Sequence, residues 1–205
     1  MAGSVRATAA ILAATLLLAA CQPSQPGQPT PTSSPSSPVA TPTPTFMCTP
    51  EAGGEASPCS EAQYDEMKAK DALYEEAEAV FREYFAENIR ISRAGGVKEP
   101  TEVLARTTSD SLQENLMAVF RDMAERGVAA KGNDPTLTVA REPGVSREGS
   151  LVTLRVCADA SGWSFYRGDE LMSDGRPAEE RVYFARRGDR LKMFYSEGKW
   201  VKRCD

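Results

Sequence analysis

The sequence contains no histidine, so it lacks the side chain that most often moves protons near neutral pH and that commonly binds zinc. It also lacks a glycine-rich phosphate loop, a nucleophile elbow and a dinucleotide-binding fingerprint. Acidic residues outnumber basic ones, 29 to 24, and the resulting net charge of −5 does not favour a nucleic-acid partner. We therefore expect no metal site, no cofactor and no binding to nucleic acid.

The first 20 residues combine one positive charge, at Arg6, with an uncharged apolar run from Ala7 to Ala20. This pattern is typical of a secretory signal. A helix formed by the run is too short to span about 30 Å of hydrocarbon, and no charged segment follows it. We therefore expect residues 1–20 to be removed as a signal peptide.

The end of the apolar run, Leu18-Ala19-Ala20-Cys21, resembles the lipobox of bacterial lipoproteins. The resemblance implies that the Cys21 thiol carries a diacylglyceryl group, with acyl chains such as palmitate, and that cleavage occurs before this cysteine. Two acyl chains hold a protein on a membrane where one chain gives only marginal binding. The alternative is an ordinary cleaved signal followed by a free or paired cysteine. The lipobox implies an extracytoplasmic protein, lipid-anchored to the cell membrane.

Residues 21–46 are predicted to form a disordered stalk. From Gln22 to Thr45 the chain is nearly all Pro, Ser, Thr and Gln and carries no charge. Such a composition buries too little apolar surface to offset the entropy of ordering. Its prolines favour an extended conformation at about 3.1 Å per residue, which would separate the following domain from the membrane by up to about 75 Å. A proline-rich ligand for a partner protein is the alternative, and glycosylation of the stalk stays open.

Four cysteines follow the stalk: Cys48, Cys59, Cys157 and Cys204. An even number of cysteines in an exported chain indicates disulfides, and four cysteines allow three pairings. We favour Cys48 with Cys59, which closes a loop over residues 47–60, and Cys157 with Cys204, which lie in two strand-like segments. None of the cysteines has the spacing of metal ligands.

Residues 61–205 are predicted to form one α+β globular domain. Apolar residues at spacings of three and four predict a helix over 60–92, and Gly95-Gly96 ends it. A short helical turn follows over 101–107, and a capping-box pattern, Ser111 to Glu114, predicts the start of a third helix that ends near Gly127. Alternating residues then predict strands. Helices followed by antiparallel strands predict N-terminal helices packed on one curved antiparallel β-sheet. The expected strands lie near 137–139 and over 150–158, 180–187 and 190–204.

This order of elements, with Gly198-Lys199-Trp200-Val201 in the last strand, resembles the nuclear transport factor two-like superfamily, a cystatin-like α+β cone. A strand with Cys and Asp, Cys157-Ala158-Asp159, occurs here together with a cysteine near the C-terminus, Cys204. In this the chain resembles small Gram-positive envelope lipoproteins that contain this domain. The resemblance implies a pocket between the helices and the concave face of the sheet. The loop from Cys48 to Cys59 has no counterpart in the family pattern.

Some enzymes of the superfamily, such as ketosteroid isomerases, place an acid or base in this pocket, where an apolar wall tunes its pKa. The candidate bases here are Asp159 and Glu180, and the candidate hydroxyl donors are Tyr84, Tyr183 and Tyr195. The alternatives are that Asp159 caps a turn and that the tyrosines belong to the core or cavity wall.

An aromatic cluster near a loop, Trp163 with Phe165 and Tyr166, is either an exposed recognition patch or part of the core.

The favoured function is a non-enzymatic binding or scaffold domain displayed on the outer face of the plasma membrane. Its partner would be an envelope protein or a small apolar ligand. One alternative is an isomerase- or cyclase-like enzyme that acts on a lipophilic small molecule. The other is a purely structural subunit that forms a homodimer. A pocket filled by Tyr and Phe side chains would count against the enzyme.

Overall fold

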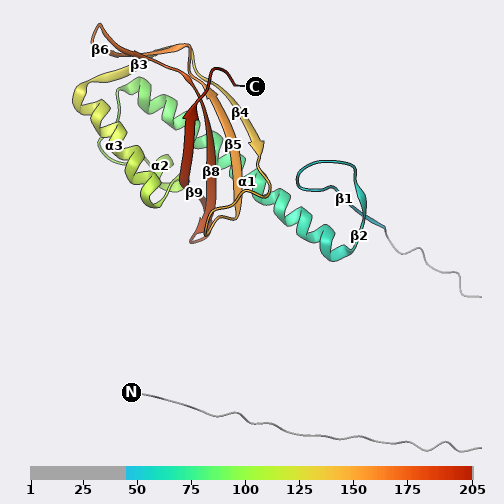
Figure 1. Ribbon diagram of the computed structural model, residues 1–205. Helices are drawn as coiled ribbons and strands as arrows, with labels where there is room; N and C mark the ends of the chain where they lie inside the picture. Colours follow the sequence, from blue (N-terminus) through green and yellow to red (C-terminus); the bar gives the residue numbers. More distant parts are fainter. Residues whose placement is uncertain (1–44, 205) are drawn as a thin grey trace, which may run out of the picture. The chain divides into compact units, whose positions relative to one another are not determined.

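The computed structural model describes residues 45–204, which form part of one compact unit (Figure 1). The predicted signal peptide, the lipobox with Cys21 and nearly all of the stalk lie outside the described residues. The elements are β1 (Phe46–Cys48), β2 (Ser57–Cys59), α1 (Glu61–Ala94), α2 (Glu102–Thr107), α3 (Asp110–Arg126), β3 (Val128–Gly132), β4 (Thr136–Arg141), β5 (Val152–Asp159), β6 (Trp163–Arg167), β7 (Glu170–Asp174), β8 (Pro177–Arg187) and β9 (Arg190–Trp200).

Helix α1 has defined signals at both ends, and the structure confirms the long first helix. Ser60 is its N-cap and forms a capping box with Gln63, in which each side chain binds the other residue's backbone N–H. Gly95 ends the helix in a left-handed conformation, with φ of 83°, that costs glycine little. The helix therefore begins and ends close to the predicted bounds.

The third helix was predicted to start with a capping box at Ser111, which was wrong, because its N-cap is Ser109. Helix α3 begins at Asp110, Ser109 is its N-cap, and no side-chain cap hydrogen bond forms there. Asp110 has a positive φ of 54°, and its carboxylate accepts a hydrogen bond of 2.6 Å from Arg187 on β8. The first residue of this helix is thus held by a contact distant in sequence, and the helix does not start at the pattern of Ser111 to Glu114.

The strands form three sheets, so the prediction of a single curved sheet carrying the N-terminal helices was wrong. The hairpin β1-β2 stands by itself, β3-β6-β7 form a three-stranded sheet, and β4-β5-β8-β9 form a four-stranded sheet. All neighbouring strands are antiparallel.

Glycine and proline separate the two larger sheets. A Cβ atom at Gly132 would overlap the carbonyl oxygen of Gly162, and one at Gly175 would overlap that of Ala160. Gly132 is at the end of β3, Ala160 and Gly162 lie between β5 and β6, and Gly175 lies between β7 and β8, so the close approaches occur where the chain passes from one sheet to the other. Pro135 precedes β4 and has no N–H to continue a ladder. Each run of strand is therefore interrupted at a glycine or proline.

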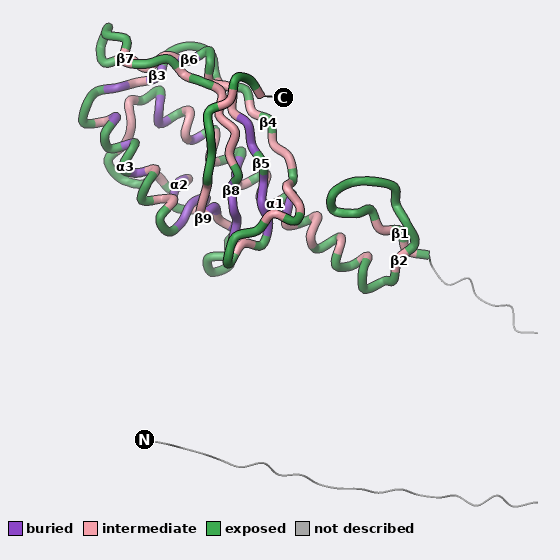
Figure 2. The backbone as a smooth tube through the Cα atoms, viewed as in Figure 1, coloured by how far each residue is buried: buried purple, intermediate pink, exposed green. Residues whose placement is uncertain are grey.

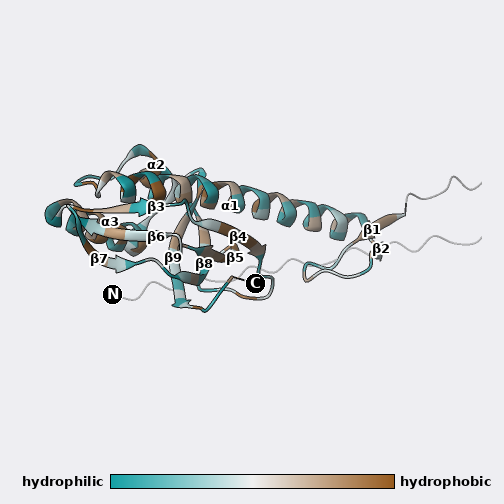
Figure 3. Cartoon of the chain, turned by 90° about the horizontal axis from the view of Figure 1, so that it is seen from above, coloured by the Kyte–Doolittle hydropathy of each residue, from teal (hydrophilic) through white to brown (hydrophobic). Residues whose placement is uncertain are grey.

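The core lies between the second part of α1 and one face of the four-stranded sheet. Tyr74, Ala77 and Phe81 of α1 pack with buried side chains of β5, β8 and β9, including Leu154 and Phe184. A second cluster joins the C-terminal end of α1 to α2 and α3. The buried positions of α1 begin only at Tyr74 (Figure 2). The first turns of the helix extend past the sheet toward β1 and β2 (Figure 3).

Cys48 is bonded to Cys59, and Cys157 is bonded to Cys204, which confirms the favoured pairing. Structural disulfides persist in oxidising compartments, so the domain is extracytoplasmic. Among residues 45–204, no helix has both the length and the apolar character that crossing a membrane requires.

Candidate functional site

The structure separates the predicted pocket residues into three places. Tyr84 packs against the core between α1 and the four-stranded sheet, and Glu180 is near enough for its charge to act on the Tyr84 phenol. Tyr183 and Tyr195 lie together on the opposite face of that sheet, with ring centroids 5.9 Å apart. Asp159 lies apart from both, at the end of β5. The five candidate side chains therefore do not line one pocket.

Glu180 is a carboxylate on the helix-facing side of the sheet. Glu180, Val182 and Phe184 are two residues apart along β8, so their side chains share one face of the sheet. Burial raises the pKa of the Glu180 carboxyl, and a hydrogen bond with Ser196 opposes that rise. Gly198 lies across from Glu180 on β9, and a Cβ there would come within 2.5 Å of the Glu180 Cγ. Glycine in the last strand therefore leaves room for this side chain.

Tyr84 shares this region with other aromatic side chains of α1. The Phe81 ring lies 5.8 Å from the Tyr84 ring and 6.2 Å from the Phe85 ring, and all three pack in the core cluster. Burial and the charge of Glu180 raise the pKa of the Tyr84 phenol. Aromatic rings pack on this side of the sheet, and Glu180 itself lines a small cavity of about 300 Å³ formed by residues of β8 and β9.

Tyr183 and Tyr195 are held by charged neighbours on the outer face of the sheet. The Tyr183 hydroxyl donates a 2.7 Å hydrogen bond to Glu197, and the guanidinium of Arg147 lies 3.6 Å from the centroid of the Tyr195 ring. Burial and the neighbouring Glu197 raise the pKa of the Tyr183 phenol. The Tyr183 hydroxyl is thus engaged by Glu197, and the Tyr195 ring packs against Arg147.

Asp159 caps a turn. Its carboxylate accepts a 2.9 Å hydrogen bond from the backbone N–H of Ser161, and the hydrogen bonds with Ser161 lower the pKa of the Asp159 carboxyl. This is the Asx-turn geometry that aspartate commonly adopts after a strand.

Trp163 belongs to the core. It is 6% exposed and its ring packs edge-on against Phe165, with centroids 5.8 Å apart. Among the described residues, its indole N–H is the buried side-chain group that lacks a hydrogen-bond partner. The recognition-patch alternative therefore does not hold for Trp163.

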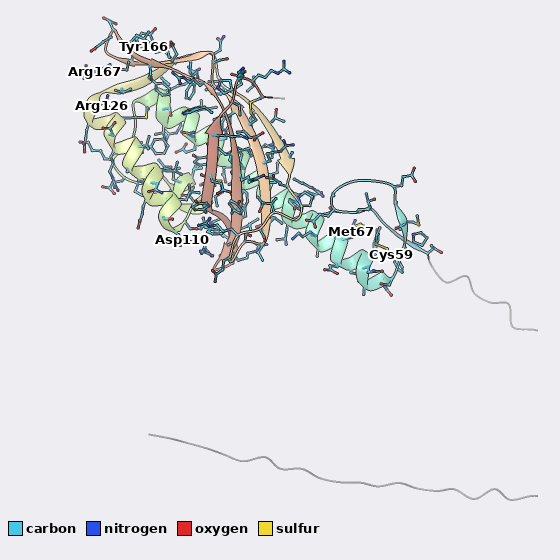
Figure 4. All side chains as sticks on the ribbon, in the orientation of Figure 1. Cys59, Met67, Asp110, Arg126, Tyr166 and Arg167 are labelled. Carbon is cyan, nitrogen blue, oxygen red and sulfur yellow. A yellow bond between two sulfur atoms is a disulfide. The ribbon has the colours of Figure 1, made fainter. Side chains whose placement is uncertain are left out.

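A groove of about 760 Å³ lies between the disulfide-closed loop and the first turns of α1. Its volume is within the range of small-molecule sites. Met67, on the helix, and Cys59, in the hairpin, lie at this end of the domain (Figure 4). The groove is lined by Thr49, Pro50, Glu51, Gly53, Gln63, Glu66, Met67, Ala69, Lys70, Asp71, Leu73 and Arg141.

Polar contacts hold the loop wall of this groove against the helix. The Thr49 N–H donates to the Met67 Sδ at 3.3 Å, and the Tyr74 hydroxyl donates to Glu51 at 2.8 Å. Burial and the hydrogen bond to Glu51 raise the pKa of the Tyr74 phenol. The Lys70 ammonium lies 4.0 Å from the Glu51 carboxylate. The loop is thus attached by hydrogen bonds and charges in addition to its disulfide.

The sequence prediction did not place a groove here, although one signal was available. A helix of 34 residues is about 51 Å long at 1.5 Å per residue, whereas an 11-residue strand spans about 37 Å. A helix this long must extend past the sheet that it covers. Its apolar residues before Tyr74, such as Tyr64 and Met67, then need another partner. The hairpin supplies it, since the Phe46 ring lies 5.3 Å from the Tyr64 ring.

Within residues 45–204, no group of three or more Cys, Asp or Glu side chains is arranged to hold a metal ion.

No protein-family model matches the chain, and no curated protein matches it. Among solved structures, the chain is similar to the intermembrane space region of the chloroplast protein ARC6, at 15% identity and a TM-score of 0.44, over 61% of this chain and 95% of that one. It is also similar to a de novo designed β-sheet protein, at 12% identity and a TM-score of 0.34, over 62% of this chain and 92% of that one. Similarities at this level do not indicate a function.

Proposed function

We propose that this chain is a bacterial envelope lipoprotein that displays a binding domain on the outer face of the cell membrane. In this proposal Cys21 carries the lipid anchor, residues 22–45 form the stalk, and the groove between the loop and α1 takes the ligand. The domain itself would perform no chemistry.

The observation that carries the proposal is the use of the cysteines. The chain has five, and four of them pair within the domain as two disulfides. Cys21 is therefore left with no cysteine of its own chain to bond. An unpaired cysteine in an exported protein is unusual and needs a separate explanation. Its position directly after an apolar run and two alanines supports lipidation as that explanation.

The lining of the groove indicates what kind of ligand it would take. Met67, Ala69 and Leu73 contribute apolar surface to the lining, while Glu51, Asp71 and Arg141 contribute charged groups. Asp71 and Arg141 pair with each other. A ligand with an apolar body and a few polar groups matches this lining. Methionine is suited to such a surface because its unbranched side chain adapts to different shapes.

The anchor is tested by replacing Cys21 with serine in the full chain, expressed in a bacterium that processes lipoproteins. We expect the parent protein in the membrane fraction and Cys21→Ser in the soluble fraction. Cys59→Ser is the matched control, because it also removes one cysteine but leaves the lipobox intact, and it should stay with the membrane. Membrane retention of Cys21→Ser would contradict the anchor.

The groove is tested by native mass spectrometry of the full chain, extracted from membranes in a neutral detergent. We expect the parent protein to retain a small molecule that Ala69→Trp has lost, because the indole would fill the groove from its helix wall. Ala79→Trp is the matched control, since Ala79 is an exposed alanine of the same helix outside the groove. Equal retention by both variants would rule out the groove as the binding site.

A second candidate, an isomerase- or cyclase-like enzyme, is favoured by one feature, the raised pKa of the partly buried Glu180 carboxyl near Tyr84. Its test is the retained molecule itself. An enzyme would convert that molecule when the parent protein is incubated with it, and Glu180→Gln would abolish the conversion. A binding protein would return it unchanged.

A further inference from the structure

A second cavity, of about 470 Å³, lies on the outer face of the four-stranded sheet. One part of its lining comes from β5 and the neighbouring strands, including Arg155 and Lys199. The other part comes from residues 201–203, which the Cys157–Cys204 disulfide connects to β5. We propose that this cavity binds a phosphate-bearing anion, and that the disulfide keeps two of its cations in place.

The charge of the cavity is opposite to that of the chain. Among residues 45–204, four cations line it, Arg155, Lys199, Lys202 and Arg203, with a single carboxylate, Glu179. The whole sequence has a net charge of −5. Positive charge is therefore concentrated at one place on an acidic protein, which attracts anions to that place.

The single carboxylate only partly neutralises its neighbours. The Glu179 oxygens lie 3.8 Å from the Arg155 guanidinium and 3.5 Å from the Lys199 ammonium, beyond the 2.7–3.2 Å typical of N–H···O hydrogen bonds. On the same strand, Arg181 binds Glu142 at 2.9 Å. Lys202 has no ion-pair partner among the described residues. Hydrogen-bond donors thus remain available to a ligand.

Phosphate fits these donors for two reasons. Arginine presents a planar fork of N–H donors that binds two phosphate oxygens at once, and lysine adds a compact charge that follows the anion. Three cations, Arg155, Lys199 and Lys202, against the single carboxylate Glu179 are an excess that also favours a group with more than one negative charge. A free phosphate compound and a phospholipid headgroup share this chemistry, and the experiment below separates them.

The disulfide connects the two parts of the cavity. Cys157 lies on the same face of β5 as Arg155, because residues two apart on a strand point to one side. Its bond to Cys204 therefore draws Lys202 and Arg203 over that face. The backbone bond from the Val201 N–H to the Pro177 carbonyl, at 3.0 Å, adds a second attachment. Without the disulfide, the cations of residues 202–203 would be less often at the cavity.

The test is calorimetric titration of the full chain, in a neutral detergent without reductant or divalent cations, with inorganic pyrophosphate as the probe. We expect Arg155→Gln and Lys202→Gln each to weaken binding about tenfold, consistent with loss of one charge-assisted contact. Lys98→Gln is the matched control, since it removes the same charge from an exposed loop position, and it should leave affinity within about twofold. Equal losses in all three variants would overturn the site.

The role of the disulfide is tested with a pair of double variants that change no charged residue. Cys157→Ser with Cys204→Ser should weaken binding by about tenfold, whereas Cys48→Ser with Cys59→Ser, at the other disulfide, should not. If the Cys157/Cys204 variant is folded by circular dichroism and binds as tightly as the parent, the disulfide has no role in the site. The two charge variants still test the site if this variant does not fold.

The source of the phosphate is tested by repeating the titration with short-chain dihexanoyl phosphatidylglycerol, and with dihexanoyl phosphatidylcholine as the zwitterionic control. Binding of phosphatidylglycerol alone would assign the site to an anionic lipid headgroup. Binding of pyrophosphate alone would assign it to a free phosphate compound. If neither anion binds, or if phosphatidylcholine binds equally well, the proposal is wrong. None of these outcomes depends on the groove at α1 or on the anchor.

Discussion

The two parts of helix α1 are stabilised in different ways. From Tyr74 onward the helix has buried residues: Ala77 packs against the four-stranded sheet, Ile91 packs against α2 and α3, and neither has exposed surface. Before Tyr74 none of its residues is buried. That first part depends on a capping box at Ser60, on polar contacts with the loop and on the Cys48–Cys59 disulfide.

This difference indicates where the domain can change shape. Regions with few buried apolar contacts open at low free energy, and ligand-binding segments are commonly drawn from them. The groove lies against the first part of α1. The second part of the helix therefore shares the buried core of the sheet, while the first turns of α1 and the loop have few buried apolar contacts.

The largest expected effect compares a truncation in each part. Phe184→Ala removes a fully buried ring from the core and should lower the free energy of unfolding by about 3–5 kcal/mol. Met67→Ala, in the first part of α1, should lower it by no more than about 1 kcal/mol because its side chain is only half-buried. Urea denaturation followed by circular dichroism measures both. Equal losses would mean that the two parts are stabilised alike.

The next effect is local. Replacing Cys48 and Cys59 with serine releases a short loop, for which the chain-entropy estimate is about 3 kcal/mol. We expect this loss in the opening free energy of residues 61–73, measured by hydrogen exchange, with the protection of the core strands unchanged. A matching loss of protection in β5 and β8 would mean that the loop and the core unfold together.

How far the sequence predicted the fold depended on how local each signal was. The apolar spacing and glycine end of α1 are local, so the helix was predicted closely. Strands β3, β6 and β7 have five residues each and were missed as a separate sheet, because so short a run gives little alternation. Gly132 and Gly175 marked the interruptions between the sheets, but only the backbones that face them explain why glycine is needed there.

The candidate site depended even more on the tertiary fold. A family resemblance made Tyr84, Asp159, Tyr183 and Tyr195 candidates for one pocket, with a turn cap as the alternative for Asp159, and that alternative is confirmed. Glu180 and Tyr183 are three residues apart on β8, so strand alternation puts them on opposite faces of the sheet. The groove combines residues 49–53 with the first turns of α1 and with Arg141 of β4, segments far apart in the sequence that only the fold brings together.

A smaller effect concerns the pH dependence of stability that Glu180 causes on the helix-facing side of the sheet. Because burial raises the pKa of the Glu180 carboxyl above its usual 4.5, the folded state holds that proton more tightly than the unfolded state does. The stability contribution of this group is therefore complete below pH 4.5 and is lost as the pH rises through the raised folded pKa. Glu180→Gln should remove this loss and stabilise the protein at pH 7 by about 1 kcal/mol. Thermal unfolding of the parent protein and of Glu180→Gln from pH 4 to pH 7 measures this difference. The same pH dependence of stability in both proteins would mean that the Glu180 carboxyl is well solvated.

The smallest expected effect concerns the cap of α1. Ser60→Ala removes the side chain that accepts from the Gln63 N–H and should destabilise the first turn by about 0.5–1 kcal/mol. Hydrogen exchange should detect faster opening at residues 61–66, while urea denaturation of the whole domain stays the same. Thr101→Ala, at the cap of α2, makes a useful contrast because α2 packs on the core through Leu104. Its effect should appear in global unfolding.

The most direct test of the account is the intact mass of the full chain recovered from bacterial membranes without reductant. The account predicts a chain that starts at Cys21, carries the added mass of a lipid on that residue and lacks about 4 Da for its two disulfides. A secreted chain cleaved at another position, with no lipid on Cys21, would contradict the proposed anchor.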